Sequence, residues 1–115
     1  MSTTAVSEAR PKFLVYAPDK TEEGTFERRL TARPDHLVKA KENISSGFIR
    51  VGGALVSPDT YQLPDKKMVG SAFICEADNI EDVRKQVEDD VYYKNGIWDP
   101  EKIVILPIIP ATPIP

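Results

Sequence analysis

Thr31–Ala32–Arg33–Pro34–Asp35–His36–Leu37 holds the only histidine of the chain and lies inside its longest helical pattern. Apolar residues recur around it at intervals of three and four, which places them on one face of a helix. This apolar row is made up of Phe26, Leu30, Leu37 and Ile44. His36 lies at the edge of the row, in line with Arg29, Arg33 and Ala40. We therefore expect a helix over residues 25–46 whose histidine borders the core and reaches a cavity.

Pro34 interrupts this pattern because it has no N–H to donate to the carbonyl of Leu30. Two structures remain open. Either the helix kinks at the proline, or a first helix ends near Ala32 and a second begins with Pro34 at its first position. In both cases the backbone is irregular within one turn of His36. An imidazole is the side chain best suited to proton transfer near neutral pH.

Four apolar runs predict strands at residues 12–17, 48–56, 67–77 and 102–109. A second helix is expected at residues 79–88, with Asp78 or Asn79 as its N-cap. The order β–α–β–β–α–β is that of ferredoxin-like folds. The predicted fold class is therefore α+β, with a four-stranded antiparallel sheet and both helices on one face. Proline at position 107 predicts that the second half of the last strand lies at an edge of the sheet, at a bulge or outside the hydrogen-bond ladder.

The second face of this sheet would be left uncovered, although all four strands contribute apolar residues to it. This predicts a homodimer in which two sheets pack face to face. The domain itself is expected over residues 12–109. A flexible N-terminal arm at residues 1–11 and an extended, proline-rich tail at residues 110–115 would flank it.

The composition is that of an ordinary globular domain, with 115 residues of which 41% are hydrophobic and 29% charged. A formal net charge of −3, without a basic block, gives no support to nucleic-acid binding. No apolar run approaches the roughly 20 residues that a membrane span needs. Residues 1–6 lack the features of a secretory signal. We therefore expect a cytoplasmic protein without a nucleic-acid or membrane partner.

Neither a metal nor another cofactor is expected. The single cysteine, Cys75, lies in an apolar strand pattern, and no Cys/His cluster accompanies it. Gly52 and Gly53 lie inside a predicted strand, outside the strand–GxGxxG–helix context of a dinucleotide site. They mark either a β-bulge or a place where a ligand approaches the backbone, and both interpretations remain open.

Several short segments, in this order, resemble the YciI-like (YCII-related) family of the dimeric α/β-barrel superfamily. They lie at residues 13–17, 29–30, 33–37, 52–54, 70–71 and 90–98, so that the resemblance covers roughly residues 12–109. The resemblance implies the ferredoxin-like fold described above. Enzymes of that family include a dechlorinating lyase that acts on chlorinated hydroxyaromatic compounds.

The same resemblance implies a catalytic dyad formed by His36 and Asp90, with the neighbouring Asp89 as the alternative carboxylate. Positions that match Arg33 and Ser71 line the pocket in that family. The full set of expected substrate-binding residues is Arg33, Ser71, Gly52, Gly53 and Tyr16.

The predicted function is a small, cofactor-free enzyme of the isomerase or lyase type. His36, oriented by Asp90, would transfer a proton on a small carbonyl, lactone or hydroxyaromatic compound. Arg33 and Ser71 would hold the oxygen on which negative charge develops. Three alternatives stay open. The chain could be a non-catalytic, small-molecule-binding or stress-related module, it could be a structural partner whose sheet binds another chain, or His36 could have only a structural role.

Overall fold

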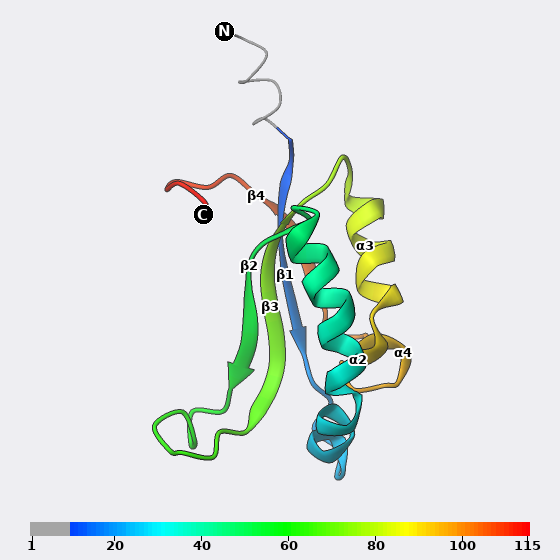
Figure 1. Cartoon of the computed structure of the whole chain (residues 1–115), viewed down its shortest axis with the longest axis vertical. Helices are drawn as coiled ribbons and strands as arrows, with labels where there is room; N and C mark the ends of the chain where they lie inside the picture. Colours follow the sequence, from blue (N-terminus) through cyan, green and yellow to red (C-terminus); the bar gives the residue numbers. More distant parts are fainter. Residues whose placement is uncertain (1–9) are drawn as a thin grey trace, which may run out of the picture.

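The computed structural model describes residues 10–115, so most of the expected arm at residues 1–11 lies outside the described part of the chain. Four strands and three helices follow one another there (Figure 1). In chain order they are β1 (Lys12–Pro18), α2 (Thr25–Ser45), β2 (Ile49–Val56), β3 (Met68–Glu76), α3 (Ile80–Asp89), α4 (Val91–Lys94) and β4 (Val104–Ile108).

The four strands form one antiparallel sheet in the order β2-β3-β1-β4, and α2 and α3 cover one of its faces (Figure 1). The fold is thus α+β and ferredoxin-like, as predicted. Strand β4 lies at an edge of the sheet, where the missing N–H of Pro107 does least harm to the hydrogen-bond ladder.

The core lies between this sheet and the helices. Along β1, Phe13, Val15 and Ala17 are buried against the helices, whereas Leu14 and Tyr16 point to the other face. From the helical side, Val83 and Val87 of α3 complete the core, together with the aromatic segment that follows α3. Because the pattern alternates, β1 is buried on one face only within a single chain.

Helix α2 runs through Pro34 without a break, so the alternative of two separate helices is wrong. It begins after Gly24, whose φ of 87° lies in the left-handed region that glycine adopts most easily. Thr25 is the first helical residue, and its hydroxyl donates to the carbonyl of Glu22 at 2.8 Å.

The face of α2 that is buried differs from the face that the apolar row predicts. Thr25, Arg29 and Ala32 are the buried positions, whereas Leu30 and Ile44 of the apolar row are exposed. The row that contains His36, not the apolar row, therefore turns toward the sheet. The physical reason is that the charge of Arg29 finds a buried partner, as described below.

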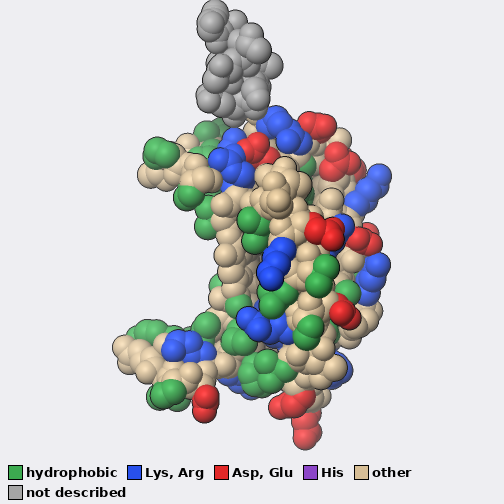
Figure 2. All heavy atoms as spheres, viewed as in Figure 1, with side chains coloured by type: hydrophobic (Ala, Val, Ile, Leu, Met, Phe, Trp, Pro, Cys, Tyr) green, Lys and Arg blue, Asp and Glu red, His purple; other side chains and the backbone are tan. Residues whose placement is uncertain are grey.

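The face of the sheet away from the helices carries exposed apolar side chains. The strand register places Leu14, Tyr16, Val51, Val104 and Leu106 together on it. Beyond its ends, the 57–67 connection and the C-terminal tail project to the same side, with a hollow between them (Figure 2). The tail bends back instead of continuing straight, and Arg50 donates to the carbonyl of Pro115 at 3.1 Å.

Candidate functional site

A cavity of about 380 Å³ lies between α2 and the β2–β3 hairpin. Its sheet side is lined by small residues, among them Gly52, Ala54 and Ser71. A Cβ atom added at Gly52 would lie 3.0 Å from the Cβ of Phe73, closer than such atoms normally approach. The glycine therefore keeps the strand pair close together and leaves space above it, beneath the helix.

His36 borders this cavity and is bound to Asp90. The distance from His36 Nδ1 to Asp90 Oδ1 is 2.9 Å, and the two side chains are only 18% and 13% exposed. Because a carboxylate can only accept, Nδ1 carries the proton, and in the neutral imidazole Nε2 then keeps its lone pair. The arrangement therefore leaves one imidazole nitrogen able to accept a proton.

Asp90 is held in place by the local fold. It ends α3 and is the N-cap of the short helix α4, where its Oδ1 accepts the N–H of Tyr92 at 2.9 Å. The same oxygen thus receives hydrogen bonds from a backbone amide and from His36. A capping aspartate has little rotational freedom, so the carboxylate is aimed at the imidazole before any ligand arrives.

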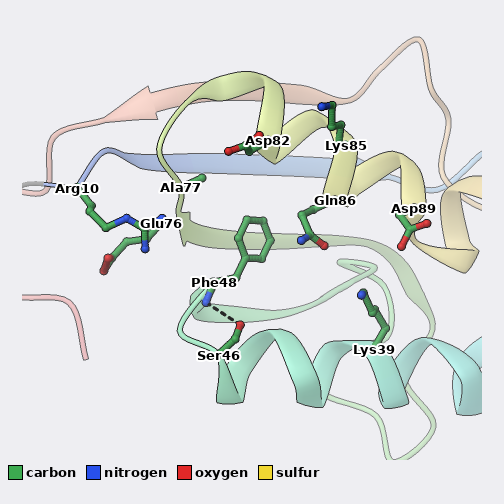
Figure 3. A pocket seen from close by; sticks show the side chains of 10 residues that line it. All are labelled: Arg10, Lys39, Ser46, Phe48, Glu76, Ala77, Asp82, Lys85, Gln86 and Asp89. Atoms are coloured by element: carbon green, nitrogen blue, oxygen red, sulfur yellow. Dashed lines mark hydrogen bonds between the residues drawn. The ribbon is translucent and has the colours of Figure 1, made fainter.

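Asp89 belongs to a different part of the surface. It accepts from Lys94 at 3.0 Å, an interaction that lowers the pKa of the Asp89 carboxyl. Its side chain lines a separate polar hollow of about 550 Å³ into which Lys39 also points (Figure 3). Phe48 and Gln86 line both this hollow and the cavity. Of the two candidate carboxylates, the structure brings Asp90 to His36.

Two buried aromatic rings enclose the imidazole. Tyr92 is stacked on His36, with 3.9 Å between ring centroids and an interplanar angle of 11°. Trp98 meets His36 edge-on at 6.3 Å. Burial raises the pKa of the Tyr92 phenol, so that it stays neutral well into the alkaline range. Both rings also line the cavity, which gives it an aromatic wall.

An ion pair lies beneath this wall. Arg29 Nη1 donates to Asp19 Oδ1 at 2.7 Å, and the two side chains are 4% and 5% exposed. The guanidinium also lies 4.5 Å over the ring of Tyr92 and donates to Ser71 Oγ at 3.0 Å. Burial raises the pKa of the Asp19 carboxyl, although the charge of Arg29 acts in the opposite direction.

The structure brings most of the expected substrate-binding residues to the cavity and separates one from it. Arg33, Ser71, Gly52 and Gly53 line the cavity. Tyr16 does not, because it points to the opposite face of the sheet, where it is 44% exposed. In the strand register Tyr16 pairs with Ala72, so its side chain points to the same face as that of Ala72 and away from that of Ser71.

Sequence patterns alone gave Arg29, Tyr92 and Trp98 no firm place in the site. The available signal was their position. Arg29 is in line with His36 on the helix, and the two aromatic residues follow directly after Asp90. What the pattern could not supply was the long-range contact between Arg29 and Asp19.

Among residues 10–115, no three His, Cys, Asp or Glu side chains are grouped so that they could hold a metal ion. Within the same range, no helix has the length and apolar character that crossing a membrane requires. The cavity combines one available imidazole nitrogen with the cationic side chains of Arg33 and Lys66. This set of groups suits proton transfer on a ligand whose oxygen carries negative charge.

Comparison with known proteins matches the chain to a family model and to solved structures. The model of the YCII-related domain family matches residues 11–106. Among solved structures, the chain is similar to the 5-chloro-2-hydroxyhydroquinone dehydrochlorinase of Burkholderia phenoliruptrix AC1100, solved in complex with 2,5-dihydroxybenzoquinone. The TM-score is 0.70 and the sequence identity 27%, over 83% of this chain and 90% of that chain. No curated protein matches the sequence.

Proposed function

This chain belongs to the YCII-related family, and on that premise we propose that it is an enzyme of the lyase or isomerase type acting on a small hydroxyaromatic or quinone-like compound. The observation that carries the proposal is the hydrogen bond of His36 to Asp90 at the border of a cavity with an aromatic wall. The dehydrochlorinase activity of the similar structure supports the lyase type and the class of substrate.

In the proposed reaction, Nε2 of His36 takes a proton from the substrate. The resulting imidazolium lies against the carboxylate of Asp90, which balances its charge through Nδ1. In a dehydrochlorination, the electron pair left behind would move into the ring system as chloride departs, so that HCl is lost overall. In an isomerisation, the imidazolium would return the proton to another atom. Neither reaction requires a cofactor.

Arg33 is the proposed partner of the substrate oxygen. It lines the cavity, and no hydrogen bond or ion pair to the described residues is found for it. A guanidinium offers two parallel donors to an oxygen that becomes anionic as the proton leaves. Asp90 is already engaged by His36 and by the N–H of Tyr92, so the free charges around the ligand are positive.

The size of the cavity suits a single substituted ring. Its volume of about 380 Å³ lies near the lower end of the range for small-molecule sites, roughly 300–1,000 Å³. The rings of Tyr92 and Trp98 offer flat apolar surface against which an aromatic substrate could lie.

The test is a turnover assay on hydroxylated and chlorinated benzenes and quinones, including 5-chloro-2-hydroxyhydroquinone, with chloride release and ring absorbance as readouts. His36→Gln keeps a polar side chain of similar size but has no titrating ring. It should lower kcat/KM at least about 100-fold, since general base catalysis typically supplies 10²–10⁴-fold. Tight binding of 2,5-dihydroxybenzoquinone without turnover of any compound would instead support a non-catalytic binding module.

We also propose that the chain acts as a homodimer through the exposed face of its sheet, with residues 12–109 as the functional domain and 110–115 as its tail. Support comes from the apolar side chains gathered there, among them Leu14, Val51 and Leu106. Contiguous apolar surface of this kind is uncommon on proteins that stay monomeric. A cytoplasmic location stays a prediction from the sequence.

A further inference from the structure

The hydroxyl of Ser71 lies between the buried Arg29–Asp19 ion pair and the cavity. Its Oγ accepts from Arg29 Nη2 at 3.0 Å and from the indole Nε1 of Trp98 at 3.3 Å. Ser71 is buried and still lines the cavity. Both of its neighbours are buried as well, so this arrangement is shielded from bulk water.

The hydrogen bonds of Ser71 use both of its acceptor lone pairs and leave its O–H donor unused. A serine hydroxyl has two acceptor lone pairs and one O–H donor. Guanidinium and indole groups can only donate, so together they occupy both lone pairs of Oγ. No acceptor for the O–H is found among the described residues. The O–H is therefore left as a donor at the wall of the cavity.

The buried guanidinium of Arg29 determines the direction in which the O–H group of Ser71 points. Arg29 is held from one side by Asp19, whose second oxygen, Oδ2, has no hydrogen-bond partner within residues 10–115. The guanidinium thus has a fixed position, and its N–H toward Ser71 draws electron density from Oγ. Hydrogen bonds in such chains strengthen one another, particularly away from water.

We propose that Ser71 presents its O–H to an ionised oxygen of the substrate, and that Arg29 is the positioning residue that holds Ser71 in this donor role. This deepens the function proposed above and rests on it. It also narrows the substrate class: one oxygen of the ring is bound as an acceptor, as in a phenolate or a hydroxyquinone anion, while His36 acts elsewhere on the same ring.

A purely structural role is the alternative. In that case Arg29, Ser71 and Trp98 would only complete one another's hydrogen bonds in the core. A substitution at Ser71 would then change the affinity for all ligands equally. A pair of ligands that differ only in whether two of their ring oxygens can ionise separates the two cases. 2,5-Dihydroxybenzoquinone is ionised at neutral pH, whereas 2,5-dimethoxybenzoquinone keeps the ring and carbonyls but cannot ionise.

The experiment measures the affinity of the full chain for both quinones by calorimetric titration. Ser71→Ala should weaken binding of the dihydroxy compound about 10–100-fold, as expected for a hydrogen bond to a charged oxygen. Its affinity for the dimethoxy compound should change less than about threefold. Ser71→Cys keeps an acceptor for Arg29 and a weak S–H donor, so an intermediate loss is expected.

Arg29→Lys tests the positioning role, with Arg28→Lys on the same helix as the matched control. Arg28 lies outside the cavity and is partly exposed. Arg29→Lys keeps the positive charge but loses the forked contact with Asp19 and Ser71, and we expect the same selective loss for the dihydroxy compound. Arg28→Lys should bind both quinones as the unaltered chain does. If Arg29→Lys does not fold, as judged by near-UV circular dichroism, the Ser71 variants decide alone.

Two results would overturn the inference. Ser71→Ala could bind both quinones with unchanged affinity, or it could lose both to the same extent, which indicates a structural role. In either case the unaltered chain still binds, so the proposed function survives. If the unaltered chain binds neither quinone, both the inference and the proposed class of substrate fall.

Discussion

Tyr92 connects the two charged parts of the site at the scale of single residues. His36 stacks on its ring, and the guanidinium of Arg29 lies over the same ring. Two groups so close to one ring centroid cannot share a face, so the tyrosine lies between them. Both partners come from α2, about two helical turns apart. The position of the imidazole therefore depends on a buried ion pair that it does not touch.

Removing the carboxylate of that pair should destabilise the fold strongly. Asp19→Ala leaves Arg29 buried without a counter-charge, which typically costs about 3–5 kcal/mol. Urea unfolding measures the change. Asp35→Ala removes an exposed carboxylate and should stay within about 0.5 kcal/mol of the unaltered chain. A loss at Asp19 no larger than that of the control would show that the pair contributes nothing to stability.

Cys75 supplies a prediction for alkaline pH. Burial raises the pKa of its thiol from 9.0 to about 12. Between these values the unfolded chain loses the thiol proton while the folded chain keeps it, so stability falls as the pH rises. From pH 8 to pH 10, the chain should lose about 1 kcal/mol more unfolding free energy than Cys75→Ala does. Parallel curves for the two proteins would contradict the raised pKa.

At the scale of elements, the junction between α3 and α4 positions the proposed dyad. The family resemblance implied Asp90 as the partner of His36 and left the neighbouring Asp89 as the alternative. The N-cap of α4 distinguishes them, because only Asp90 has its side chain turned inward to the N–H of Tyr92. A hydrogen bond between a capping side chain and a backbone amide two residues later leaves no periodic pattern in the sequence. The sequence therefore could not decide between Asp89 and Asp90 as the partner of His36.

The element-scale prediction concerns the glycines of β2. Gly52→Ala places a Cβ 3.0 Å from that of Phe73 and narrows the cavity floor, so we expect a loss of about 1–3 kcal/mol and weaker ligand binding. Gly53→Ala meets nothing within 4 Å and should be neutral or slightly stabilising. Urea unfolding and quinone titration compare the two variants. Equal effects would show that the space above Gly52 is not what the site requires.

At the scale of the whole molecule, Pro107 allowed an edge position for β4 without requiring it, whereas element order and strand pattern were predictable from the apolar runs. The orientation of α2 was not. A helix that carries an apolar row would normally turn that row inward, yet Arg29 faces the sheet because Asp19, at the end of β1, compensates its charge. Leu30 and Ile44 are exposed as a result. Long-range pairing of this kind is invisible to local periodicity.

The proposed dimer gives the prediction at this scale. Light scattering after size exclusion should give a mass of two chains. Leu106→Glu puts a charge on the apolar face, opposite Leu14, and should raise the dimer dissociation constant at least about 100-fold. Val38→Glu, on the exposed side of α2, should leave the mass unchanged. A monomeric unaltered chain would refute the proposed assembly.

The proposed chemistry depends most on the pairing of His36 with Asp90, and one comparison of variants tests this pairing. Asp90→Asn keeps an oxygen for the N–H of Tyr92 and for the imidazole but removes the negative charge, whereas Asp89→Asn makes the same change one residue away, on the polar hollow. The measurement is kcat/KM of both variants on the hydroxyaromatic compound with the highest turnover. We predict a loss of at least about 100-fold for Asp90→Asn and less than about twofold for Asp89→Asn. Equal values for the two variants would contradict the proposed dyad.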